Sequence, residues 1–148
     1  MRSAVSVVAV VVLLGGCASS STMSSGPDVR VHLEEVAGPP DVYYFAGPVN
    51  IQYRVSIENP TDEPLTLTRL DLQTMGPGAY SLRTETTPMS LKVPPRATAS
   101  YLMSVWGRAH GGYLTAGAPV TIRGTAYFQG DTTKKSFVKL FSENLAPS

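Results

Sequence analysis

Residues 49–64 read VNIQYRVSIENPTDEP, and this stretch decides the fold. From residue 49 to residue 58 the odd positions are apolar and the even positions are polar. That period of two is the pattern of an extended strand with one buried face. The six residues that follow contain two prolines, which cannot donate ladder hydrogen bonds. The stretch therefore predicts a half-buried β-strand that ends in a tight turn.

Asn59 and Pro60 are the residues predicted to shape that turn. An asparagine side chain can hydrogen-bond to the backbone two residues further on, and proline fixes φ. We expect a structural role for both.

The same alternation recurs on both sides of this strand. Between residues 65 and 72 the leucines change parity, and a β-bulge near Thr68-Arg69 would restore their common face. Gly124 would allow a bend in a late strand, and the glycine-rich segment 107–119 is predicted to be the longest loop. Further strands are expected at residues 29–33, 80–86, 91–93, 97–105, 120–128 and 136–141.

Seven or eight short strands, with turns every eight to twelve residues, favour an all-β fold. We expect an immunoglobulin-like antiparallel β-sandwich of about seven strands, with a small barrel as the alternative. In the strand at 97–105, Leu102 and the nearby Trp106 have the parity opposite to the main apolar set, so we expect both faces there to be partly covered.

The composition divides the chain into two parts. The chain has 148 residues, 12 Lys and Arg, 11 Asp and Glu, and one cysteine. One basic residue, Arg2, lies in the first 16 residues, so the remainder carries no net charge (11 − 11 = 0). A neutral body does not fit electrostatic nucleic-acid binding, and a single cysteine excludes an internal disulfide.

The amino-terminal segment has the features of an export signal. Residues 4–14 form an apolar run interrupted only by Ser6. A helix of eleven residues spans about 16 Å, about half the thickness of a bilayer core, so the run fits a signal peptide better than a membrane span. An ordinary secretory signal cut elsewhere and a retained anchor are the alternatives.

The sequence Leu14-Gly15-Gly16-Cys17 ends this run and resembles a bacterial lipobox. The resemblance implies cleavage before Cys17, a diacylglycerol thioether on its sulfur and an acyl chain such as palmitate on its new amine. Two or more chains anchor a protein stably. Ala18, rather than aspartate, follows the cysteine, which by the same resemblance implies the periplasmic face of an outer membrane.

Three segments follow from these features: a signal peptide at residues 1–16, an acylated cysteine with a flexible tether at 17–27, and a β-sandwich domain at 28–148. The tether reads ASSSTMSSGP after Cys17. Ten small polar residues give an r.m.s. reach of roughly 17 Å, which would lift the domain off the membrane.

The body resembles the water-stress (WHy) domain of late embryogenesis abundant type 2 proteins. The resemblance rests on the strand 51–57 running into Glu58-Asn59-Pro60, on residues 63–67, on the turn at 93–95 and on the strand 120–124 that ends in glycine. It implies a seven-stranded immunoglobulin-like sandwich without catalytic residues. An immunoglobulin-like module without this kinship is the alternative.

Catalytic and metal-binding patterns are not found in the sequence. There is no nucleophile elbow and no phosphate-binding loop, and two histidines lack the spacing of a metal site. We expect a non-enzyme without cofactor, apart from the lipid on Cys17. The best candidate for a binding loop contains Trp106, Arg108, His110 and Tyr113, because loops on rigid sandwiches often bind partners.

Together these features predict an envelope lipoprotein that binds or protects another envelope component, with an envelope protein as the expected partner. The alternatives are a carrier of a small apolar ligand between the sheets and an accessory subunit of an envelope assembly.

Overall fold

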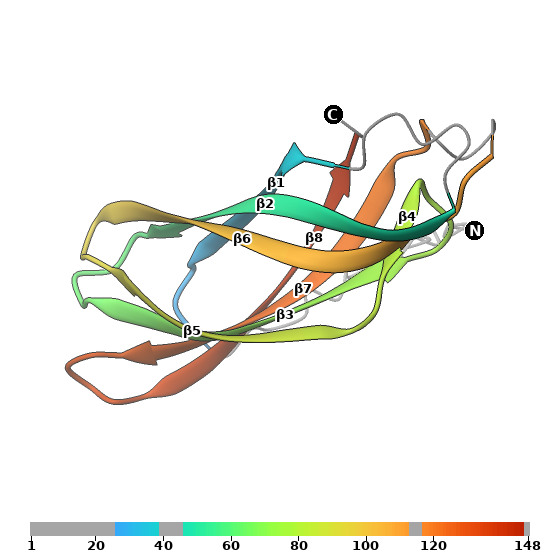
Figure 1. Ribbon diagram of the computed structural model, residues 1–148. Helices are drawn as coiled ribbons and strands as arrows, with labels where there is room; N and C mark the ends of the chain where they lie inside the picture. Colours follow the sequence, from blue (N-terminus) through green and yellow to red (C-terminus); the bar gives the residue numbers. More distant parts are fainter. Residues whose placement is uncertain (1–25, 39–45, 113–116, 147–148) are drawn as a thin grey trace, which may run out of the picture.

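The computed structural model describes residues 26–38, 46–112 and 117–146. These residues form eight β-strands (Figure 1) and contain no helix long and apolar enough to cross a membrane. The strands are β1 (Arg30–Ala37), β2 (Gly47–Asn59), β3 (Leu65–Met75), β4 (Tyr80–Leu82), β5 (Glu85–Val93), β6 (Ala97–Ala109), β7 (Val120–Gly130) and β8 (Ser136–Leu145).

The strands form two antiparallel sheets that pack face to face. The first sheet has the order β1-β2-β6-β4, and the second has the order β5-β3-β7-β8. Figure 1 shows the two layers running roughly alongside each other. The predicted all-β, immunoglobulin-like sandwich is therefore confirmed, with eight strands where about seven were expected.

Strand β2 shows how the sequence period creates the core. Its odd-numbered residues point between the sheets, and the five from Val49 to Ile57 are at most 7% exposed. The inner faces of the other strands add further buried side chains, among them Leu65, Leu67, Leu70 and Phe128. Burial of this apolar surface is the main stabilising contribution to the domain.

The predicted bulge in β3 is present. The pairing of β3 with both neighbouring strands shifts register between Leu67 and Arg69. The extra residue, Thr68, lets Leu67 and Leu70 both point into the core in spite of their opposite parity.

The segment after β3 differs from the expectation. The predicted strand at 80–86 is divided: β4 ends at Leu82 and pairs with β6, whereas Glu85 already belongs to β5 in the other sheet. The short element expected at 91–93 is the end of this nine-residue β5. Pro88 lies inside β5, which proline tolerates because β5 is an edge strand.

Two further expectations, about the start of the glycine-rich loop and about exposure, were also wrong. Gly107, Arg108 and Ala109 belong to β6, so the loop starts later than predicted. Trp106 and Leu102 are not partly covered, since they are 62% and 53% exposed. Gly124 stays within the β7–β8 ladder, and its bare Cα is needed because a Cβ there would lie 2.0 Å from the Phe141 ring.

The two ends of the sandwich differ in what they carry. We call the end with residues 26–28 and the turns 60–64, 94–96 and 131–135 the entry end. The described chain enters there, since Arg30 pairs with Glu58 and Asp28 forms an ion pair with Lys139. We call the end with residues 76–79, 110–112 and 117–119 the far end (Figure 1). The twelve residue steps of β2 between the ends correspond to about 40 Å.

Candidate functional site

The candidate binding residues Trp106 and Arg108 lie in a strand, not in a loop. Both have even numbers in β6, whose odd-numbered side chains Val105 and Ala109 are buried. Successive side chains of a strand point to opposite faces, so Trp106 and Arg108 share the outer face of the first sheet. They lie near its far end, where Asn50 and Pro48 of β2 are their cross-strand partners.

These two residues line a shallow hollow of about 350 Å³ on that outer face. On its other side are Ser81, which pairs with Arg108, and Arg83 just after β4. Gly107 lets β4 approach closely, because a Cβ at this position would lie 2.9 Å from the Ser81 carbonyl oxygen. The hollow is lined by Pro48, Ser81, Arg83, Trp106, Gly107 and Arg108.

The hollow presents two positive charges without a counter-charge in the described structure. Arg30, Arg54, Arg69 and Arg96 each form an ion pair with a carboxylate. Among the described residues, no such ion pair is made by Arg83 or Arg108, and the hollow contains no acidic side chain. An exposed guanidinium pair beside an exposed indole is a surface that favours an anion.

His110 is held at the edge of this region by two hydrogen bonds. Its Nδ1 lies 3.0 Å from the carbonyl oxygen of Gly78, which can only accept, so Nδ1 carries a proton. Its Nε2 lies 3.1 Å from the Ser81 hydroxyl oxygen. His110 therefore positions Ser81 at the rim of the hollow instead of pointing into it.

Ser81 and Arg83 were not among the residues predicted from the sequence to form a binding surface. Their signal was the alternation of residues 80–83, in which Tyr80 and Leu82 are buried and the residues between and after them face outward. Tyr113 lies outside the described residues, as do Leu14, Gly15, Gly16 and Cys17.

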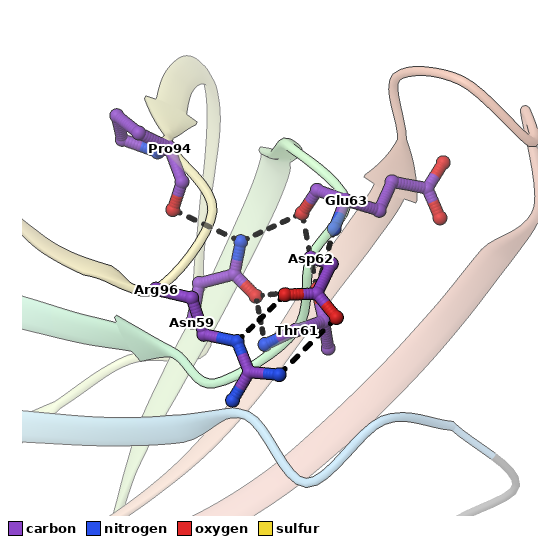
Figure 2. Close-up of polar contacts among 6 residues, drawn as sticks. All are labelled: Asn59, Thr61, Asp62, Glu63, Pro94 and Arg96. Atoms are coloured by element: carbon purple, nitrogen blue, oxygen red, sulfur yellow. Dashed lines mark hydrogen bonds and ion pairs between the residues drawn. The ribbon is translucent and has the colours of Figure 1, made fainter.

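Asn59 forms the predicted turn at the opposite end (Figure 2). Its side chain is fully buried, and its Oδ1 accepts hydrogen bonds from the Thr61 backbone amide at 3.0 Å and hydroxyl at 2.7 Å. Its Nδ2 donates to the carbonyl oxygens of Glu63, Val93 and Pro94 at 2.8, 3.2 and 3.1 Å. The amide thus ties the end of β2 to the turn after β5, and its role is structural.

Carboxylates in the same turn are also engaged. Asp62 pairs with the guanidinium of Arg96, whose hydrogen bonds and charge lower the pKa of that carboxyl (Figure 2). Glu63 accepts hydrogen bonds from the backbone amides of Thr132 and Thr133, chiefly the latter, and these lower its pKa. The carboxylates of Asp62 and Glu63 therefore have structural roles at the entry end.

A chain of polar groups crosses the core near the far end. Tyr80 donates to the Glu35 carboxylate, so the hydrogen bond of 2.7 Å between the two phenols has Tyr53 as its donor. Both phenols are fully buried, and burial is the main reason that their pKa values are raised. The two tyrosines therefore stay neutral in the folded protein at pH 7.

This buried pair predicts a loss of stability in alkali. In the unfolded chain the two phenols ionise near pH 10, whereas the folded domain keeps their protons. Stability contributed by the pair is therefore complete below pH 10 and falls above it, by about 1.4 kcal/mol per pH unit for each tyrosine. Denaturant unfolding between pH 9 and pH 11 should show a shallower decline for Tyr53→Phe. Tyr101→Phe, which alters an exposed phenol, should leave the wild-type slope; an unchanged slope for Tyr53→Phe would contradict this reading.

Metal ligands do not gather in the described structure: no group of three or more His, Cys, Asp or Glu side chains could hold an ion there. His32 is exposed and lies 3.3 Å from Glu143 across the β1–β8 edge.

Comparison with known proteins adds support for the fold. No family model matches the sequence, and no curated protein matches it. Among solved structures, a Bordetella pertussis protein designated ApaA is 17% identical with a TM-score of 0.50, over 80% of this chain and 91% of that one. A protein from Archaeoglobus fulgidus is 8% identical with a TM-score of 0.46, over 80% of this chain and 96% of that one. At 17% identity, the likeness to the Bordetella pertussis protein concerns the fold alone, and the lower score of the second structure carries no argument.

Proposed function

We propose that this protein is a non-enzymatic envelope lipoprotein that binds another component of the cell envelope through the hollow around Trp106. Cys17 carries the lipid, residues 18–27 form the tether, and the sandwich is the binding module. The observation that carries the proposal is the position of the hollow, near the end of the sandwich opposite to where the tether joins.

The anchor is supported by the amino-terminal sequence. An apolar run of signal-peptide length leads into Leu14-Gly15-Gly16-Cys17, and the chain has no other cysteine. Each buried CH₂ group contributes about 0.8 kcal/mol, so a diacylglycerol with an additional acyl chain holds a protein on a membrane stably. With no aspartate after Cys17, the proposed location is the periplasmic face of an outer membrane.

The geometry of the domain supports presentation away from the membrane. The tether reaches the sandwich at residues 26–28, beside the turns of the entry end. Trp106 lies eight residue steps along β6 from Thr98, and Thr98 pairs with Glu58 near the entry end. Those steps correspond to about 26 Å. A domain held at its entry end would therefore direct the hollow toward the periplasmic space.

A stress-protective role belongs to the same proposal through the resemblance to the WHy domain. The carrier alternative has no supporting observation in the described residues. Most inner positions of both sheets there hold buried side chains, and the hollows beside Leu65, Trp106 and Met89 each include exposed residues.

Photo-crosslinking in intact cells tests which part of the surface is used. A benzophenone amino acid is placed in the full chain at position 106 or, as the matched control, at position 98. Both positions lie on the outer face of β6, at its two ends. We expect a discrete adduct from position 106 and none from position 98. Equal adducts from both positions, or none from either, would overturn the proposed binding surface.

A further inference from the structure

The chemistry of the hollow points to a particular class of ligand. We propose that it binds an anionic saccharide, meaning a sugar ring that carries a phosphate or a carboxylate. This inference rests on the proposed function, because it takes the face around Trp106 as the binding surface and names what that face recognises.

The charge of the hollow selects for an anion. Arg83 follows directly after β4, and Arg108 lies on the neighbouring strand β6. Both line the same depression, where the described residues supply no carboxylate. A guanidinium presents planar pairs of N–H donors that match the oxygens of a phosphate or carboxylate. Four other described arginines have acidic partners. Arg83, Arg108 and Arg123 have none among the described residues, and of these three only Arg83 and Arg108 line a common hollow.

The indole of Trp106 is the group that would contact the sugar ring of such a ligand. Trp106 is 62% exposed, so its indole is accessible to a ligand in the hollow. The C–H face of a sugar ring can pack on this flat apolar surface. Around it the outer face offers the uncharged polar groups of Asn50, Gln52 and Ser104, all exposed, which can pair with sugar hydroxyls.

An acidic peptide fits the same surface less well. Extended peptides gain affinity mainly by pairing their backbone with a free sheet edge. Under the hollow, the segment 107–109 of β6 is already paired with β2 on one side and with β4 on the other. The free sheet edge beside the hollow is that of β4, which is only three residues long and offers an extended peptide little backbone to pair with. A ligand lying on the face of the hollow is recognised mainly by side chains, which suits a sugar with an attached anionic group.

The chain contains one tryptophan, so its fluorescence reports directly on this hollow. The full chain in detergent is titrated with glucose 6-phosphate, glucuronate, glucose, inorganic phosphate and a glutamate-rich peptide. We expect saturable changes with glucose 6-phosphate or glucuronate, at concentrations at least about tenfold below those needed for glucose or phosphate. A response to only one of the two charged sugars would identify which anion the site prefers.

Variants identify the residues responsible. Arg83→Gln and Arg108→Gln should each weaken binding about tenfold, because each loses charge-assisted hydrogen bonds. Arg123→Gln, which changes an exposed arginine on the other sheet, should bind as the wild type does. All three retain Trp106 and thus the signal.

Two results would overturn the proposal: no saturable change with either charged sugar, or tighter binding of the glutamate-rich peptide than of both. If the titrations show no binding while position 106 still crosslinks in cells, the saccharide assignment is wrong and the proposed binding surface is retained. If neither method gives a signal, the saccharide assignment and the proposed binding surface are both wrong.

Discussion

Replacement of Asn59 by aspartate is expected to lower the free energy of unfolding by about 4 kcal/mol at pH 7. The substitution removes the amide donor that serves three carbonyl oxygens within 3.2 Å. It puts a carboxylate oxygen in the place of that donor, in a fully buried position. Loss of the hydrogen bonds and repulsion between the oxygens both lower the free energy of unfolding.

The pH dependence of this variant follows from the same contacts. Burial and the facing carbonyl groups raise the pKa of an aspartate at position 59 above the value of about 3.9 in the unfolded chain. The penalty is therefore largest at neutral pH and shrinks as pH falls toward 4, where the carboxyl is protonated. Chemical denaturation of wild type and variant at each pH gives the difference between their free energies of unfolding. The pH-dependent contributions of Asp62 and Glu63 are common to both proteins and cancel in this difference.

Asn50→Asp is the matched control for this substitution. It makes the same chemical change in the same strand, at an exposed outward position, and should cost less than about 0.5 kcal/mol. Asn59→Ala should cost about 2–3 kcal/mol and show little dependence on pH. A loss at Asn59→Asp no larger than at Asn50→Asp would contradict the role assigned to this turn.

The sequence predicted the core of the fold well because period two is a direct consequence of strand geometry. The alternation from Val49 to Ile57 corresponds to the buried face of β2. The parity change between Leu67 and Leu70 correctly located a bulge, since only an extra residue can keep both side chains in the core. Asn59 was recognised from its side-chain chemistry and its place before proline.

What the sequence could not predict depends on contacts between distant segments. The switch between sheets after Leu82 leaves no local signal in a run of polar residues. The sequence therefore predicts one strand over β4 and the start of β5, and a separate short element at the end of β5. Glycine usually marks turns, so the sequence predicts that a loop starts at Gly107, whereas in the structure this glycine makes room for the backbone of β4. The grouping of Arg83 with Trp106 and Arg108 arises only when β4 lies beside β6.

Replacement of Cys17 by serine is expected to abolish incorporation of labelled palmitate. Serine lacks the thiol that receives the diacylglycerol, and by the resemblance to lipoprotein signals, cleavage before residue 17 depends on that modification. The full chain should therefore accumulate with its 16 signal residues still attached. Gel mobility and palmitate labelling of immunoprecipitated protein measure both effects.

Ser19→Ala is the matched control for the cysteine variant. It alters a neighbouring small polar residue of the tether without touching the proposed lipid site, and should be labelled and cleaved as the wild type is. Persistent labelling of Cys17→Ser would place the lipid on another residue. Normal cleavage without labelling would indicate an ordinary secretory signal.

The central claim, a binding sandwich held to a membrane through Cys17, is tested most directly by the mass of the amino-terminal tryptic peptide. The protein is isolated from membranes, digested with trypsin and its peptide ending at Arg30 is examined. We expect a peptide that begins at Cys17 and carries the mass of a diacylglycerol and one further acyl chain. A peptide that begins elsewhere, or one with an unmodified Cys17, would contradict it.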